Sequence, residues 1–506
     1  MKFIKKRTET GRKPSRILQF LFLFPALLLC ALFLFLCTDG EKDQTADEAF
    51  KTFTSRLFLS NVSSNTLTLH YTLADPEAAG ITDASVSFGE YSASARERSA
   101  AALENALDTL CSFPKEELSA SNRLTYDILR VQIQSELALA KYPYYEEILS
   151  PLLGTQAQLP ILLAEYSFSS REDIETYLAL LEQIDSYYGS LLAYEREKAE
   201  AGLFMPGTPA EALITQCRDF VSDPGSHFLL SSFEERLAQA DFLSEEERKT
   251  YAEANRARVI GHVLPAYELL ADGLEELKTC GTNPYGLCYY PEGAAYYEAL
   301  IDCTIGSGRS MTEIRNLIDG QLLSDARLMA DIITRRPELL THLSRQIESQ
   351  APEDILAELQ EAIQADFPAV NSASCTVKYV APSLESYLSP AFYLTPPLDQ
   401  MNRHVIYINQ GADYDELTLF TTLAHEGWPG HLYQTMYEDS LKLDPVRNIF
   451  YFGGYVEGWA AYSERYAYRF TSLDSDSAEL LAANSFLPLG LYAQAYTGIH
   501  SHALNP

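Results

Sequence analysis

The sequence predicts a mainly α-helical protein with one small β-sheet placed just before its most informative motif. Its 506 residues are 47% hydrophobic and 21% charged, which supplies apolar material for a large core and excludes a disordered chain. Between residues 49 and 350, apolar residues recur three and four positions apart, which is the spacing of one helix face. Two short runs rich in β-branched and aromatic residues follow, at 374–380 and 404–409.

The N-terminal segment is typical of a membrane anchor. Residues 1–16 are basic, and residues 17–37 form an apolar run in which only Gln19 is polar. A helix of this length crosses a hydrocarbon layer of about 30 Å, and the positive-inside rule places the basic segment in the cytoplasm. We therefore expect an uncleaved anchor at 17–37, a polar spacer at 38–48 and an extracytoplasmic body at 49–506. Lipid attachment at Cys37 is the alternative means of tethering the body to the membrane.

Helices are expected in succession along the first part of the body. Residues 101–139 show the plainest periodicity, and Ser112-Phe113-Pro114 interrupts it, so we expect a helical hairpin there. Residues 171–203, 234–277 and 311–348 show the same periodicity with acidic outer faces. No fixed period relates these segments, which argues against a repeat protein.

A small sheet is expected after the helices. The runs 374–380 and 404–409 have strand composition, and the segment between them, 389–397, contains too many prolines for a helix. We therefore expect strands immediately before the helix that carries the candidate site.

The net charge excludes one class of partner, and the cysteine spacing argues against one kind of metal site. The formal net charge is -32, and so acidic a protein repels nucleic-acid backbones, so we exclude nucleic acid as a partner. The six cysteines after residue 40 form no C-x-x-C pair, which argues against a cysteine zinc cluster. Cys280 and Cys288 flank a Gly/Pro turn and can form a disulfide outside the cell, or they remain isolated thiols.

Residues 423–434 carry the main chemical signal. Zinc hydrolases commonly use two histidines four residues apart, with a glutamate beside the first, because such side chains leave the same helix face. Here His431 follows His425 by six residues, and on an ideal helix the two rings would point about 120° apart. Pro429 and Gly430 can break the helix and return His431 to a shared ion. The alternative is two unrelated histidines at a helix-to-loop transition.

A third ligand is expected from residues 453–464. Glu457 and Glu464 lie seven residues apart and therefore share one helix face. Two neutral histidines and one carboxylate leave a net charge of +1 on a zinc ion, which favours an activated water molecule and an open coordination position. We take Glu457 as the ligand. Glu464 then supports the ligands, competes with Glu457, or forms an ordinary ion pair with an arginine such as Arg469.

These two segments resemble a known bacterial family, the domain of unknown function 885, which is grouped with the gluzincin metallopeptidases and resembles the helical carboxypeptidase Taq type. The likeness runs from about residue 45 to residue 500. The motifs that carry it are His425-Glu426-x-x-Pro429-Gly430-His431-x-x-Gln434 and Glu457-Gly458-Trp459-Ala460-x-Tyr462-x-Glu464.

The resemblance implies a Zn²⁺-dependent peptidase acting on peptides outside the membrane. His425, His431 and Glu457 would hold the ion. Glu426 would be the general base, taking a proton from the metal-activated water and later delivering it to the leaving amine.

The resemblance also implies roles around the metal ligands. Ala391 and Tyr393 would align a peptide substrate by backbone pairing along a strand edge, although Tyr393 can also be an ordinary aromatic residue. Gln434 and Glu464 would support the ligands.

The C-terminal end departs from the family pattern. Family members continue well past the segment that here is Gly498-Ile499-His500, and Tyr496 replaces their usual acidic residue. We therefore expect a truncated chain that lacks helices packing on the site. His500 or a nearby tyrosine is the candidate for stabilising an oxyanion.

Two other functions stay open: an inactive surface-binding protein that keeps the fold, and a purely structural ectodomain. The oligomeric state is not indicated.

Overall fold

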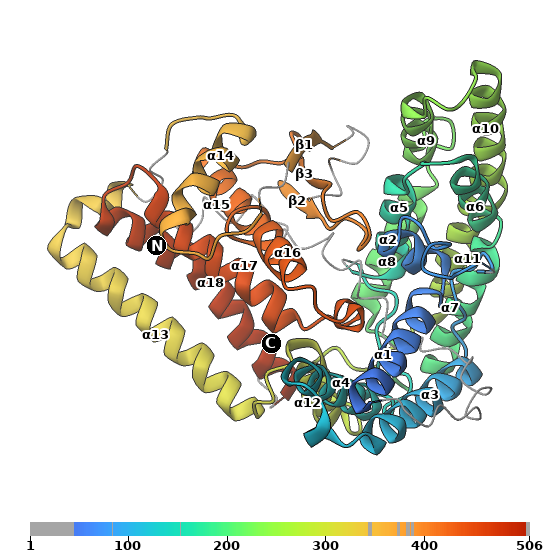
Figure 1. The fold of residues 1–506 in the computed structure, drawn as a ribbon, viewed down its shortest axis with the longest axis horizontal. Coiled ribbons are helices and arrows are strands. Elements are labelled where there is room, and N and C mark those ends of the chain that lie inside the picture. The colour runs from blue at the N-terminus through green and yellow to red at the C-terminus, as the bar shows by residue number, and fades with distance from the viewer. Residues whose placement is uncertain are drawn as a thin grey trace.

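The computed structural model describes residues 45–82, 84–151, 153–342, 347–371, 375–380, 385 and 389–501. The fold is mainly helical with one small sheet, as the sequence predicts (Figure 1). The predicted anchor at 17–37 lies outside the described residues. Among the helices of the described part, none has both the length and the apolar character needed to cross a bilayer.

The N-terminal helices form a first layer with its own core. They are α1 (Ala46–Val62), α2 (Thr66–Thr72), α3 (Ala93–Ser112) and α4 (Ala120–Leu139). Helix α1 begins inside the segment expected as a spacer, because Thr45 and Glu48 form a reciprocal capping box at its start. Helix α3 ends just before Pro114, so the predicted hairpin of α3 and α4 is confirmed.

A stack of seven helices, on the right of Figure 1, holds the largest core. These helices are α5 (Thr155–Glu165), α6 (Arg171–Leu181), α7 (Ile184–Glu200), α8 (Gly207–Phe220), α9 (Phe228–Gln239), α10 (Glu245–Arg258) and α11 (Leu264–Leu277). Leu180, Leu191 and Leu270 are fully buried in this core. Each of the predicted segments 171–203 and 234–277 contains more than one helix, with turns or a π-helical stretch at the joints.

The remaining helices build the half of the molecule that carries the candidate site. They are α12 (Gly293–Ile305), α13 (Met311–Arg335), α14 (Pro352–Ala362), α15 (Glu416–Glu426), α16 (His431–Ser440), α17 (Gly453–Ala467) and α18 (Ser475–Ser501). Short 3-10 turns lie at Lys115–Glu117, Leu287–Tyr289, Pro337–His342, Ile363–Ala365, Pro445–Ile449 and Tyr468–Phe470.

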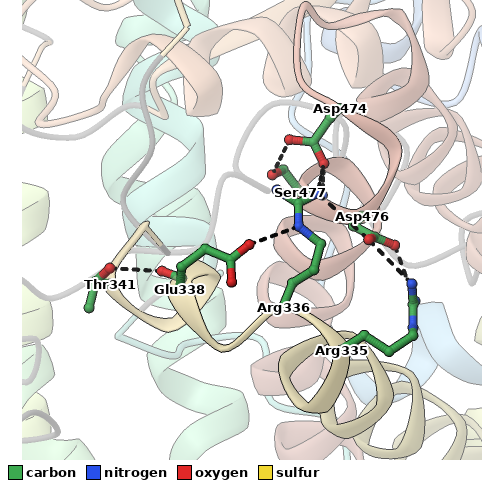
Figure 2. A network of polar contacts seen from close by, with 7 residues as sticks. All are labelled: Arg335, Arg336, Glu338, Thr341, Asp474, Asp476 and Ser477. Carbon is green, nitrogen blue, oxygen red and sulfur yellow. Dashed lines mark hydrogen bonds and ion pairs between the residues drawn. The ribbon is translucent and has the colours of Figure 1, made fainter.

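Helices α13 and α18 run side by side (Figure 1). Figure 2 shows the polar network that joins the end of α13 to the start of α18. Arg335 bonds to Asp476 at 3.1 Å, and Arg336 bonds to Asp474 at 2.5 Å. Both arginines are partly exposed, so each pair contributes little to stability.

The sheet contains β1 (Cys375–Tyr379), β2 (Ala391–Leu394) and β3 (His404–Ile408), in the order β1-β3-β2. Strand β3 is parallel to β1 and antiparallel to β2. Because β3 lies in the middle, β2 is an edge strand of this sheet. Phe392 packs into the core of α5–α11, whereas Ala391 and Tyr393 pack into a second core with α14–α16. The predicted sheet is confirmed, and it joins these two cores.

The cysteines in the described part of the chain are free thiols. Cys280 and Cys288 therefore follow the isolated-thiol alternative, and Cys288 donates a hydrogen bond to the Ile499 carbonyl at 3.3 Å.

Candidate metal centre

The helix that carries His425 stops one residue later. Helix α15 ends at Glu426 and α16 begins at His431, with a cis peptide bond between Trp428 and Pro429. The N–H of Gly430 donates to the Ala424 carbonyl at 2.9 Å, and a Cβ at Gly430 would overlap the His425 carbonyl. Only glycine allows so close an approach of two backbones. The predicted break between the two histidines is confirmed.

The break brings both histidines to Glu457, and we call His425, His431 and Glu457 the metal trio. The two rings lie 4.8 Å apart between centroids. Glu457 Oε2 lies 3.7 Å from His425 Nε2 and 4.0 Å from His431 Nε2. Two ligands of one tetrahedral zinc ion are separated by about 3.3 Å. The ligand atoms of the trio therefore lie close to the spacing that a shared ion requires.

A polar atom without a partner supports the fit of a cation. His431 Nε2 is buried and has no hydrogen-bond partner among the residues described in the structure. Such an atom costs free energy unless something satisfies it. The donor set of two imidazoles and one carboxylate suits zinc. The trio thus fits a zinc ion in both chemistry and spacing.

Helix α17 supplies a second carboxylate to the histidines. Glu464 Oε2 lies 3.3 Å from His425 Nδ1. A metal-binding histidine usually donates its other ring N–H to such a carboxylate, which fixes the tautomer and the ring orientation. Arg469, the alternative partner of Glu464, lies over the ring of Tyr466 instead. The structure therefore places the carboxylate of Glu464 against His425 and not against Arg469.

The same helix is attached to the break itself. Trp459 Nε1 and Ser463 Oγ both donate to the carbonyl of Pro429, at 2.8 and 3.2 Å. These bonds attach α17 to the segment between the two histidines. The sequence showed Trp459 only as part of a motif and gave no signal for Ser463, because no spacing rule reports a bond between distant segments.

Glu426 lies beside the trio and is 1% exposed. Its Oε2 accepts a hydrogen bond from the Tyr393 N–H at 3.0 Å. Burial raises the pKa of Glu426 to about 7, while His425 and the Tyr393 N–H act in the opposite direction. A carboxylate with a pKa near neutrality can both accept and return a proton. The position and pKa of Glu426 suit the predicted role of general base.

The edge of β2 runs past Glu426. The Asn409 N–H donates to the Pro390 carbonyl at 2.8 Å, so by antiparallel alternation the backbone groups of Ala391 and Tyr393 point away from β3. The Ala391 carbonyl accepts a bond from Ser389 Oγ at 2.8 Å. The Tyr393 hydroxyl is buried and bonds to His404 Nδ1 at 2.8 Å. The predicted strand edge therefore exists beside the site, with Tyr393 contributing its backbone to it.

The charges around the trio favour a cation. Burial alone lowers the pKa of His425, but its bond to Glu464 and the charges of Glu426, Glu464 and Glu457 outweigh burial and raise the pKa to about 9. Burial and the neighbouring His425 lower the pKa of His431 well below its ordinary value. Three carboxylates around two imidazoles leave an excess of negative charge. A divalent cation would neutralise that excess.

A cavity of about 1210 Å³ opens next to the trio. His431, Tyr393 and Gln434 line it on one side, and Leu124 and Val131 of α4 line it on another. Its volume exceeds that of a site for one drug-sized molecule. Gln434, one turn after His431, thus lies on the cavity wall.

Tyr451 also lines this cavity, and the sequence did not single it out. Its hydroxyl donates to Glu457 Oε1 at 2.9 Å.

The structure does not bring His500 to the trio through any contact it describes. His500 Nδ1 accepts a bond from the Leu287 N–H at 3.2 Å, and the ring stacks on Tyr297 with centroids 5.3 Å apart. These contacts join the end of α18 to the segment around the start of α12. The oxyanion role of His500 stays a prediction.

Comparison with known proteins adds the family and the fold. A family described as "Bacterial protein of unknown function (DUF885)" matches residues 76–485. A protein described as a "putative lipoprotein" from Colwellia psychrerythraea is 19% identical, with 90% of this chain and 84% of that chain covered and a TM-score of 0.76. A second protein, described as a "putative lipoprotein of unknown function" from Shewanella oneidensis, is 16% identical, with 89% and 83% covered and a TM-score of 0.59. No curated protein matches the chain.

Proposed function

We propose that this chain, which belongs to the DUF885 family of bacterial proteins of unknown function, is a zinc-dependent hydrolase of peptide bonds. The observation that carries the proposal is the convergence of His425, His431 and Glu457 beside the buried carboxyl group of Glu426. Three metal ligands next to a carboxylate that can accept and return a proton form an arrangement that can hydrolyse an amide.

Each residue has a defined task in this proposal. His425, His431 and Glu457 would hold the ion, and Glu464 would keep the His425 ring oriented. A zinc ion bound there supplies polarisation of the substrate carbonyl and lowers the pKa of a water molecule. Glu426 would accept a proton from the attacking water molecule and return it to the leaving amine. Its bond to the Tyr393 N–H aims one carboxylate oxygen while the hydrolysis proceeds.

The edge of β2 is suited to bind the substrate as an added strand. Backbone groups of Ala391 and Tyr393 point away from β3. The Tyr393 N–H is already bonded to Glu426, so an extended peptide would pair with the remaining backbone groups of this edge. The cavity of about 1210 Å³ beside His431 gives room for the side chains of a short peptide. The substrate class we propose is therefore peptides in extended conformation.

The proposal includes tethering outside the cytoplasmic membrane. The apolar run 17–37 follows a basic segment, and two proteins of similar fold are described as lipoproteins. An anchored or lipidated N-terminus would present the site to peptides in the extracytoplasmic space.

Hydrolysis of a peptide library by the purified protein tests the proposal. We expect turnover that stops with a chelator, returns with zinc, and falls by about 10²–10⁴-fold in Glu426→Gln, the size of effect expected for a general base. Glu426→Gln should still bind zinc, because it leaves the trio intact. Glu358→Gln, the same change on the exposed face of α14, is the matched control and should retain full activity.

Two results would count against a peptidase. Activity that survives both the chelator and Glu426→Gln would exclude the proposed site. Zinc bound at one equivalent with no turnover of any peptide would instead favour a binding protein that keeps the metal.

A further inference from the structure

Both carboxylate oxygens of Glu457 have defined surroundings. Oε2 faces His425 Nε2 at 3.7 Å and His431 Nε2 at 4.0 Å. Oε1 accepts a hydrogen bond from the Tyr451 hydroxyl at 2.9 Å. One oxygen is therefore directed at the histidines, and the other is occupied by a phenol.

The residues that follow Tyr451 in the chain are packed against the end of α12. On one side, the ring of Phe452 packs directly against Gly306, whose φ of +71° is a left-handed conformation that favours glycine. Further along, Gly454 at the start of α17 lies so close to the Ile305 carbonyl that a Cβ would overlap it. These contacts with the end of α12 restrain the backbone next to Tyr451.

We propose that Tyr451 is a positioning residue that holds Glu457 so that only Oε2 is presented to the metal. A carboxylate can bind an ion through one oxygen or two, and its side chain is free to rotate unless a second bond restrains it. The Tyr451 hydroxyl provides that restraint, and it leaves a coordination position for substrate and water. This inference rests on the proposed function, because it needs a metal at the trio.

Zinc affinity of Tyr451→Phe tests the inference without any assay of activity. The substitution keeps the ring and removes only the hydroxyl. We expect zinc binding, measured by competition with a chelator, to weaken by about 10–100-fold, the range for residues that orient metal ligands. The visible absorption spectrum of the cobalt-loaded protein should also change, because the coordination of the ion changes. The thermal unfolding midpoint of the metal-free protein should stay close to that of the wild type.

Tyr462→Phe is the matched control. Tyr462 lies on the same helix as Glu457, the residue is 54% exposed, and its ring contacts with Trp459 and Tyr466 survive the change. It should bind zinc and cobalt as the wild type does.

A double-mutant cycle separates positioning from a general structural effect. If Tyr451 acts through Glu457, then Tyr451→Phe should cause no further loss of affinity in a Glu457→Ala background. Unchanged zinc affinity in Tyr451→Phe would overturn the inference, as would losses that add in the double variant. A wild-type protein that binds no zinc would refute the proposed function and this inference together, whereas zinc binding unaffected by Tyr451→Phe would refute the inference alone.

Discussion

Buried ionisable side chains determine the chemistry at the scale of single residues. Burial raises the pKa of Glu426 to about 7, which keeps a proton acceptor near neutrality. The side chain of His425 is 12% exposed, and the surrounding carboxylates outweigh burial and raise its pKa to about 9. Burial always disfavours the charged form, so the nearest charges decide which direction prevails. Three carboxylates stabilise the charged form of His425 and outweigh its burial. For Glu426, His425 and the Tyr393 N–H offset only part of the effect of burial.

Glu136 shows the same effect outside the site and gives a pH-dependent prediction. It is 5% exposed, it accepts a bond from Gln132 at 2.6 Å, and burial raises its pKa from 4.5 to about 7. The folded state therefore binds this proton more tightly than the unfolded state does. The contribution to stability is complete below about pH 4 and is lost as the pH rises through 7.

Glu136→Gln should remove this dependence. Between pH 5 and pH 8, the free energy of unfolding of the wild type should fall by roughly 2 kcal/mol more than that of the variant. Urea titrations at the two pH values measure the difference. Parallel pH profiles for the two proteins would show that Glu136 does not titrate in this range.

At the scale of elements, three helices and the break between two of them build the site. The Pro429 carbonyl in the break receives bonds from Trp459 and Ser463 of α17. On its other side, α17 is attached to α13, because Arg465 donates to both carboxylate oxygens of the buried Asp325. Helix α17 is thus fixed from two directions, and with it the carboxylates of Glu457 and Glu464.

Gly430→Ala tests the break. The added Cβ would overlap the His425 carbonyl, so α15 and α16 must separate to admit it. We expect a loss of about 1–3 kcal/mol in the free energy of unfolding and a zinc affinity at least about tenfold weaker, since the trio would be displaced. Denaturant titration and chelator competition measure the two effects.

Gly189→Ala in α7 is the matched control, because nothing lies within 4 Å of its added Cβ. It should leave zinc affinity unchanged and stabilise the protein by about 0.5–1 kcal/mol, the usual gain in a helix interior. A Gly430→Ala variant that behaved like this control would show that the close approach is not needed for the site.

At the scale of the whole molecule, the site lies where separate cores meet. The sheet contributes Phe392 to the core of α5–α11 and Tyr393 to the core around α15, and the Tyr393 backbone reaches Glu426. The cavity is lined by α4 of the N-terminal layer as well as by α16. Binding of a metal at the trio should therefore stabilise the folded molecule as a whole.

Zinc should raise the thermal unfolding midpoint of the wild-type protein. At a free concentration one hundred times the Kd, a ligand that binds only the folded state adds about 2.7 kcal/mol. A chelator should reverse the shift, and Glu457→Ala should show a much smaller one at the same zinc concentration. An equal shift in Glu457→Ala would mean that zinc acts elsewhere on the protein.

Much of the fold could be predicted because its signals are local. The α3–α4 hairpin follows from apolar spacing and from Pro114, and the sheet follows from strand-like runs on either side of a proline-rich segment. Helix boundaries were less accurate. The predicted segment 171–203 is two helices, α6 and α7, because turns between them keep the same apolar periodicity.

The sequence by itself determined the helical class, the small sheet and the two motifs that supply His425, His431 and Glu457, because these depend on residue type and on spacing within one segment. Only the tertiary structure decided that the three side chains meet, that Tyr451 and Trp459 hold their surroundings, and that the contacts of His500 lie at α12. Local periodicity specifies which face of one element is apolar. The distance between side chains on different elements depends on how those elements pack, and no spacing within a segment encodes it.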